Sequence, residues 1–142
     1  MSATPSARIN AAIDALPLRP GIRVLEVGCG PGVAAREIVR RHPSAYVLGI
    51  DRSAKAIQQA IAGSRHEVVA GKLSFRQVAV EKIQLGPDEV PYDLAFALRV
   101  GALDGRHPDL GVLALPRLLA CLSPQGRLFI DGKENLRVPG AA

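Results

Sequence analysis

The sequence predicts an α/β fold in which helices cover a parallel sheet. Short apolar runs rich in β-branched residues alternate along the chain with helical patterns, and such runs are typical of strands buried on both faces. The clearest run spans residues 22–27. It is followed directly by Gly28, Gly30 and Gly32 and then by a helical pattern. Alternating strands and helices predict parallel strands joined by crossover helices.

Hydrophobic periodicity and Pro or Gly breaks give the expected elements, all within a single domain spanning residues 1–142. The predicted helices span residues 7–16 (within an N-terminal helical region 1–19), 32–41, 54–62 and 110–122. Pro116 must begin or kink the last of these. The predicted strands span residues 22–27, 46–50, 73–78, 92–98 and 127–130. The alternating pattern of 73–78 is typical of an outer strand. Residues 123–126 are expected to form a turn and residues 131–142 a polar, largely unpaired tail.

A strand, a glycine turn and a helix N-terminus together form the geometry of a nucleotide-type site. Glu26 is the unusual residue here, because a carboxylate at the end of a buried strand is costly unless something pairs with it. A cationic ligand group resting over the glycine loop would provide that partner. The alternative is a strand–helix turn that binds no ligand.

Asp51 ends the second predicted strand, 23 residues after Gly28. An acid at about this spacing suits the two hydroxyls of a ribose, because a carboxylate accepts both hydrogen bonds. The alternative role is capping of the next helix, but Ser53 is better placed for that. We therefore expect Asp51 to bind a ribose.

Two motifs carry a family resemblance. The pattern Glu-x-Gly-x-Gly-x-Gly at residues 26–32 and Gly-Ile-Asp-Arg-Ser at residues 49–53 resemble the first two motifs of the class I S-adenosylmethionine-dependent methyltransferases. The resemblance covers about residues 20–131. It implies S-adenosylmethionine as cofactor and a Rossmann-like, doubly wound sheet of strand order 3-2-1-4-5. Val33 stands where the dinucleotide fingerprint has its third glycine, which disfavours a nicotinamide cofactor.

The resemblance also implies which residues hold the cofactor. Under it, the methionine part is held by Glu26, Gly28, Cys29, Gly30 and Gly32, the ribose by Asp51, the adenine by Arg52, Ala79 and Val80, and Leu98 lies beside the methyl donor. Ala79 stands where the family commonly has an acid that bonds the adenine amino group. The backbone contact from Val80 is therefore expected to remain, and Glu81 either substitutes for the acid or forms a salt bridge with a surface lysine, which is the preferred interpretation.

No catalytic residue is predicted, because the sulfonium already makes its methyl group electrophilic and alignment of the acceptor supplies the acceleration. His107 is the candidate general base, since a neutral imidazole accepts a proton near pH 7. The preferred interpretation is a loop histidine without such a role. The three histidines and two cysteines lack metal-ligand spacing, so no metal is predicted.

The amino-acid composition indicates which kinds of molecule the protein is expected to act on. The net charge is +5, but the 18 Lys and Arg residues are scattered, and the five aromatic residues do not interleave with a basic run. The signature of base amino-group methyltransferases is also absent after residue 96. A small-molecule acceptor is therefore expected, with nucleic acid not favoured. No run of 18 apolar residues and no signal-like N-terminus is present, and Cys29 and Cys121 are expected to stay reduced, so a cytoplasmic protein is predicted.

The family usually continues after the fifth strand with a helix and an antiparallel hairpin, which this sequence is expected to lack. The strand 127–130 would then be an edge with unpaired backbone groups. The tail, a second copy or a partner chain would cover it. The sequence thus predicts a small S-adenosylmethionine-dependent methyltransferase. The alternatives are a non-catalytic subunit that binds S-adenosylmethionine or S-adenosylhomocysteine within a larger assembly, and an RNA methyltransferase.

Overall fold

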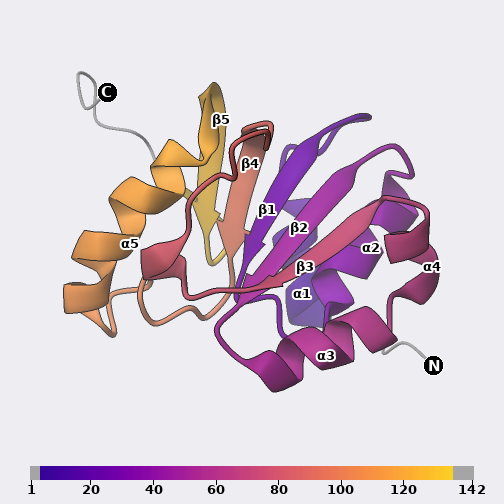
Figure 1. The fold of residues 1–142 in the computed structure, drawn as a ribbon, viewed down its shortest axis with the longest axis horizontal. Coiled ribbons are helices and arrows are strands. Elements are labelled where there is room, and N and C mark those ends of the chain that lie inside the picture. Colours follow the sequence, from indigo (N-terminus) through magenta and orange to yellow (C-terminus); the bar gives the residue numbers. More distant parts are fainter. Residues whose placement is uncertain (1–3, 136–142) are drawn as a thin grey trace.

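The computed structural model describes residues 4–135 and shows helices on both faces of a mainly parallel sheet (Figure 1). Within these residues the sheet has six strands in the order β3-β2-β1-β4-β5-β6. The first five are parallel, which confirms the predicted α/β class and the order 3-2-1-4-5. The strands are β1 (Arg23–Val27), β2 (Tyr46–Asp51), β3 (Leu73–Gln77), β4 (Tyr92–Ala97), β5 (Leu122–Ile130) and β6 (Lys133–Asn135).

The helices lie in two layers. They are α1 (Ala7–Asp14), α2 (Val33–Arg41), α3 (Ala54–Ala62), α4 (Arg65–Val69) and α5 (Pro108–Ala120), with a 3-10 turn η1 (Val80–Lys82). Side chains of a strand alternate between the two faces of the sheet. Val24 accordingly packs in one core with residues of α1 and α2, and Leu25 packs in a second core with residues of α5. No helix within residues 4–135 is long and apolar enough to cross a membrane.

The C-terminal part of the sheet differs from the prediction. β6 pairs antiparallel with β5, with Lys133 opposite Ile130 and Asn135 opposite Leu128. The prediction of an unpaired tail is therefore wrong for residues 133–135, and β5 is not a sheet edge. The sequence predicted that the tail, a second copy or a partner chain would cover β5, and residues 133–135 of the tail do so. The rest of the tail, residues 136–142, lies outside the described part of the chain.

The turn between β5 and β6 explains this pairing. It consists of Asp131 and Gly132, whose φ angles of 50° and 82° are both left-handed. Two left-handed residues match the twist of a two-residue hairpin, and Asp-Gly is a strong sequence signal for one. The side chains of β6 are all exposed, so no hydrophobic pattern marked the strand.

Three smaller differences concern local structure. α4 and η1 were not predicted, because α4 is a five-residue helix with no buried residue and η1 a three-residue turn. The predicted turn at 123–126 lies inside β5, where the register shifts between the Tyr92 and Leu94 pairings. Pro116 lies within α5 on its exposed side, so water can satisfy the carbonyl that loses its helical hydrogen bond.

Gly49 of β2 offers a test of how tightly the glycine loop packs on the sheet. A Cβ at this position would lie 2.8 Å from the Cys29 Cβ atom and 2.9 Å from Cδ1 of Phe75. Gly49→Ala should therefore lower the free energy of unfolding by about 1–3 kcal/mol through overpacking. The measurement is urea unfolding followed by circular dichroism.

Gly86→Ala is the matched control, because the nearest atom to its new Cβ lies 3.7 Å away. It should leave stability unchanged or raise it slightly through the unfolded state. Equal stability of the two variants would show that the loop does not pack against β2 as described.

Candidate functional site

A cavity of about 340 Å³ lies at the carboxyl ends of β1, β2 and β4. Its walls come from these strand ends, from residues 78–81 after β3, and from residues 98–102, Arg106, His107 and Leu110 before and at the start of α5. β1 lies between β2 and β4, so the strand order reverses here. Ligands of open α/β sheets bind at such a reversal, outside the carboxyl ends of the strands.

The glycine loop after β1 is held against the end of β2. The N–H groups of Gly28 and Cys29 both donate to the Ile50 carbonyl, at 2.8 and 2.9 Å. Gly28 has φ 70° and a Cβ there would lie 2.8 Å from Cγ2 of Val100, so only glycine fits this corner of the cavity. Gly32 has a left-handed φ of 87° and occupies the N-cap of α2. The loop therefore presents backbone rather than side chains to the cavity.

Asp51 links the loop to the second strand and to α3. One carboxylate oxygen accepts from the Gly30 N–H at 2.9 Å and the other from the Ser53 N–H at 2.9 Å. Ser53 itself caps α3 by accepting from the Ala56 N–H, as the sequence predicted. Each carboxylate oxygen has a second lone pair, so Asp51 can still accept from ligand hydroxyls in the cavity that it lines.

Glu26 is buried below the loop without a partner. The residue is 4% exposed, and its Oε1 atom accepts no hydrogen bond from any group within residues 4–135. Burial and the negative charge of Asp51 raise the pKa of Glu26 to about 8, although the positive charge of Arg36 opposes this. The structure therefore contains the buried, unpaired carboxyl that the sequence predicted at residue 26. This carboxyl would favour a ligand that places a positive charge over the glycine loop.

The far wall of the cavity contains the predicted adenine residues. Ala79, Val80 and Arg52 all line it, as does Glu81. The Val80 N–H lies at the first position of η1, where no acceptor exists within the turn. Glu81 forms no ion pair within residues 4–135, so the predicted surface salt bridge of this residue is wrong.

The structure separates the predicted residues into two groups. Those that line the cavity are Gly28, Asp51, Arg52, Ala79, Val80 and Leu98. Glu26, Cys29, Gly30 and Gly32 lie in or under the loop and shape it. Cys29 is 5% exposed, and burial followed by the charge of Glu26 raises the pKa of its thiol, so it stays neutral.

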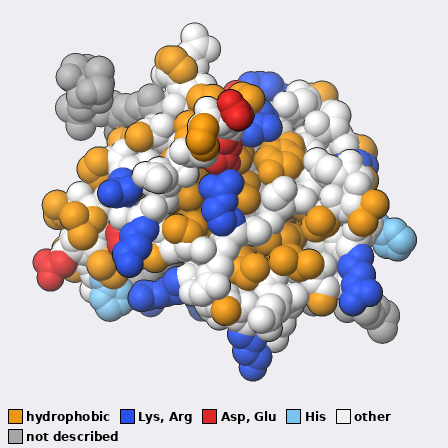
Figure 2. Space-filling model, viewed as in Figure 1, with side chains coloured by type: hydrophobic (Ala, Val, Ile, Leu, Met, Phe, Trp, Pro, Cys, Tyr) orange, Lys and Arg blue, Asp and Glu red, His pale blue; other side chains and the backbone are white. Residues whose placement is uncertain are grey.

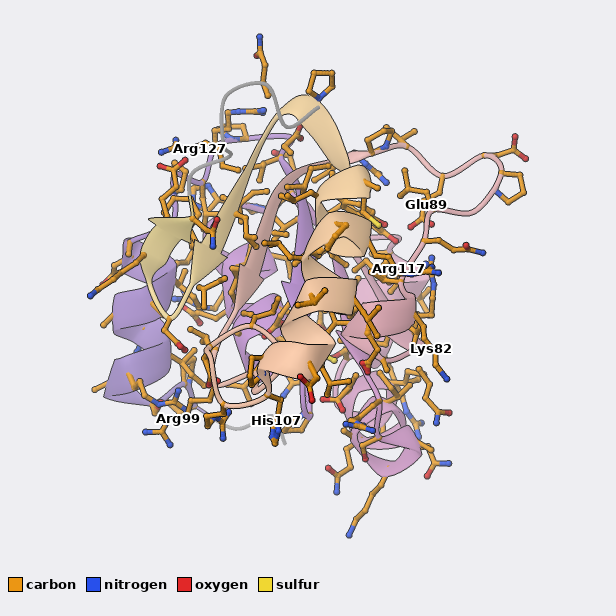
Figure 3. All side chains as sticks on the ribbon, turned by 90° about the vertical axis from the view of Figure 1, so that its left-hand side faces the viewer. Lys82, Glu89, Arg99, His107, Arg117 and Arg127 are labelled. Carbon is orange, nitrogen blue, oxygen red and sulfur yellow. The ribbon has the colours of Figure 1, made fainter. Side chains whose placement is uncertain are left out.

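His107 lies at the cavity and at the N-terminus of α5 (Figure 3). Its exposed ring packs over Gly101, where an added Cβ would clash with it. Gly101 and Arg106 of this wall were not predicted, because nothing in the sequence pattern of residues 98–107 fixes a loop conformation. Among residues 4–135 no group of three His, Cys, Asp or Glu side chains is arranged to hold a metal ion.

The comparison with known families agrees with this geometry. Residues 24–126 match the model of a methyltransferase domain. The chain belongs to this family. The match begins in β1 and ends within β5, so it includes every strand end that forms the cavity. It also confirms the predicted resemblance to the class I S-adenosylmethionine-dependent methyltransferases.

Two curated relatives share the name trans-aconitate 2-methyltransferase. The chain is 34% identical over 135 residues to a trans-aconitate 2-methyltransferase of Methylobacterium nodulans, covering 93% of this chain and 47% of the relative. It is 35% identical over 124 residues to the enzyme of that name from Paracidovorax citrulli, covering 87% and 44%. The chain thus spans about half the length of the curated relatives it matches.

Solved structures share the fold. A methyltransferase from Geobacter sulfurreducens, described as S-adenosylmethionine-dependent and in complex with S-adenosylhomocysteine, has a TM-score of 0.68 at 23% identity, covering 89% of this chain and 48% of that one. The [4+2]-cyclase SpnF has a TM-score of 0.67 at 24% identity, covering 86% and 42%. At these identities the likeness concerns the fold alone.

The buried carboxyl of Glu26 should make the stability of the ligand-free protein depend on pH. Folded Glu26 keeps its proton up to about pH 8, whereas the unfolded carboxyl ionises near 4.5. Between these values the unfolded state holds fewer protons, so stability falls as pH rises. Glu26→Gln stays neutral. Its stability relative to wild type should therefore increase from about pH 5 to pH 8, at a slope approaching about 1.4 kcal/mol per pH unit.

Urea unfolding at a series of pH values measures this difference. Asp88→Asn is the matched control, because it removes one carboxylate from an exposed loop position. A constant difference between Glu26→Gln and wild type across the series would contradict the buried, protonated state of Glu26.

Proposed function

We propose that this chain binds S-adenosylmethionine and acts as the donor-binding part of a methyltransferase with a small-molecule acceptor. The observation that carries the proposal is Glu26, a buried carboxyl without a partner directly below a glycine loop. Burial of this carboxyl is costly, and it stays protonated in the absence of a partner, whereas a cationic ligand group nearby would favour its ionised form. The cofactor supplies such a group, because its methionine part carries an ammonium group.

The remaining residues of the site fit the other parts of the cofactor. Asp51 faces the cavity with free lone pairs that suit the two ribose hydroxyls. The Val80 N–H suits a ring nitrogen of adenine. Glu81, which has no ion pair, lies at the same wall and suits the amino group that Ala79 cannot bind. When bound, the cofactor supplies an electrophilic methyl group.

In this proposal the chain aligns the reactants and removes no proton. Leu98 directly follows β4 and lines the cavity beside the expected methyl donor, and alignment of the reactants there supplies the acceleration. We assign no catalytic side chain. His107 lines the same cavity but is exposed, and it positions the start of α5 by packing on Gly101.

Two observations favour a small molecule over nucleic acid as acceptor. None of the five aromatic side chains is exposed, so no stacking platform for bases is available. Lys and Arg side chains are dispersed over the face shown in Figure 2 instead of forming one patch.

Because the relatives are named trans-aconitate 2-methyltransferases, trans-aconitate is the first acceptor to test. Cys29 and Cys121 are free and buried, which fits the predicted cytoplasmic location.

Calorimetric titration tests cofactor binding directly. The wild-type chain should bind S-adenosylmethionine and S-adenosylhomocysteine, and Asp51→Ala should weaken both by about tenfold or more, because charge-assisted hydrogen bonds to the ribose are lost. Asp88→Ala, which removes an exposed carboxylate far from the cavity, should leave both affinities unchanged. Absence of binding by the wild-type chain would refute the proposal.

Transfer of a labelled methyl group to trans-aconitate, and then to other small carboxylic acids, separates the two remaining functions. Product formation supports the methyltransferase. Tight binding of S-adenosylhomocysteine without transfer to any acceptor would favour a non-catalytic binding subunit instead.

A further inference from the structure

A second cavity, of about 530 Å³, lies between α1, the end of β4 and the β5–β6 turn, and we call it the α1 cavity. It shares Leu98 and Arg99 with the cofactor cavity. The two cavities are therefore neighbours on either side of Leu98, the residue beside which the methyl donor is expected. A molecule in the α1 cavity would lie next to the donor but outside the adenosine site.

The charge of the α1 cavity is positive. Arg8 of α1 and Arg99 line it, and neither guanidinium takes part in an ion pair or hydrogen bond within residues 4–135. By contrast, the Arg106 guanidinium is paired with Asp104 at 2.8 Å. Alanines of α1 and Leu98 form the apolar part of the wall. Unpaired guanidinium groups beside apolar surface favour an anionic group, above all a carboxylate that accepts two N–H donors.

Asp131, the one acidic residue within residues 4–135 that lines this cavity, binds the backbone of Arg99 instead of a guanidinium group. Asp131 accepts a hydrogen bond from the Arg99 N–H at 2.8 Å, and Arg106 donates to the Arg99 carbonyl at 2.8 Å. These two bonds hold Arg99 at φ 55°, a left-handed conformation that costs a residue other than glycine about 1–3 kcal/mol. The Asp131 carboxylate is thus bound to the backbone of Arg99, which leaves the Arg99 side chain available to a ligand. Figure 3 shows Arg99 at the same end of the sheet as His107.

We propose that the α1 cavity is the acceptor subsite and that Arg8 and Arg99 bind a carboxylate of the acceptor. This rests on the proposed function and specifies its substrate class as a small molecule with at least one carboxylate besides the group that is methylated. The amino-acid part of the cofactor also carries a carboxylate that these arginines could bind. The experiment must therefore distinguish binding of the acceptor from binding of the cofactor.

The test is titration of the whole chain in two stages. The first measures affinity for S-adenosylhomocysteine and for 5′-methylthioadenosine, which lacks the amino-acid carboxylate. The second measures affinity for trans-aconitate, used as a tricarboxylate probe, at saturating S-adenosylhomocysteine. The variants are Arg8→Gln and Arg99→Gln. Arg117→Gln is the matched control, because it removes the same charge from the exposed side of α5.

We expect Arg8→Gln and Arg99→Gln each to weaken trans-aconitate binding by about tenfold or more. Arg8 does not line the cofactor cavity, so Arg8→Gln should leave binding of S-adenosylhomocysteine unchanged. Because Arg99 lines both cavities, retained binding of 5′-methylthioadenosine shows that Arg99→Gln folds, and Arg117→Gln should alter none of these affinities. Loss of S-adenosylhomocysteine affinity with retained 5′-methylthioadenosine affinity would show that the arginines hold the cofactor, and would overturn the proposal.

Two further results would also overturn it. The first is wild-type trans-aconitate binding that neither arginine variant weakens. The second is a wild-type chain that binds S-adenosylhomocysteine but no mono-, di- or tricarboxylate. In both cases the proposed cofactor site would stand. A wild-type chain that binds no S-adenosylhomocysteine would instead refute the proposed function, and the acceptor subsite with it.

Discussion

The site depends on how the carboxyl end of β2 holds the glycine loop. The Ile50 carbonyl accepts from the N–H groups of Gly28 and Cys29, and the next residue, Asp51, accepts from Gly30. Because Gly49 has no side chain, Cys29 packs directly on the strand. The loop is therefore ordered before a ligand arrives, and binding does not bear the entropic cost of ordering it.

Holding the loop this close to the sheet has an electrostatic consequence. Glu26 is buried, and both its burial and the negative charge of Asp51 raise its pKa. Arg36 is the favourable charge, but its guanidinium donates to the Pro31 carbonyl and to Ser64 instead of to Glu26. Within residues 4–135 the fold thus leaves one buried carboxyl without a hydrogen-bond partner, next to the glycine loop. A buried carboxyl kept for ligand binding lowers the stability of the folded protein, and such a trade-off between stability and function is common at binding sites.

The sequence predicted the parts of the structure that depend on burial or on an unusual charge. The parallel order followed from apolar runs, and Asp51 followed from a carboxylate at a strand end. β6 could not be found in the same way, because its pairing uses backbone groups and its side chains are exposed. The Asp131-Gly132 pair was the signal that marked it. Arg8 and Arg99 were beyond prediction, because they lie far apart in the chain and the left-handed backbone of Arg99 depends on a tertiary hydrogen bond.

The two sides of the site have different structural origins. The cofactor side is built from the ends of β1, β2 and β3, which belong to the shared fold, and that fold also occurs in a [4+2]-cyclase. Fold alone therefore cannot fix the reaction. The acceptor side that we propose is lined by α1, by residues 98 and 99 after β4 and by the turn that pairs β6 with β5. In this turn Asp131 binds the backbone of Arg99 and so sets its left-handed conformation. In our proposal, acceptor specificity therefore depends on α1 and on the β5–β6 hairpin, whereas the glycine loop belongs to the donor side of the site.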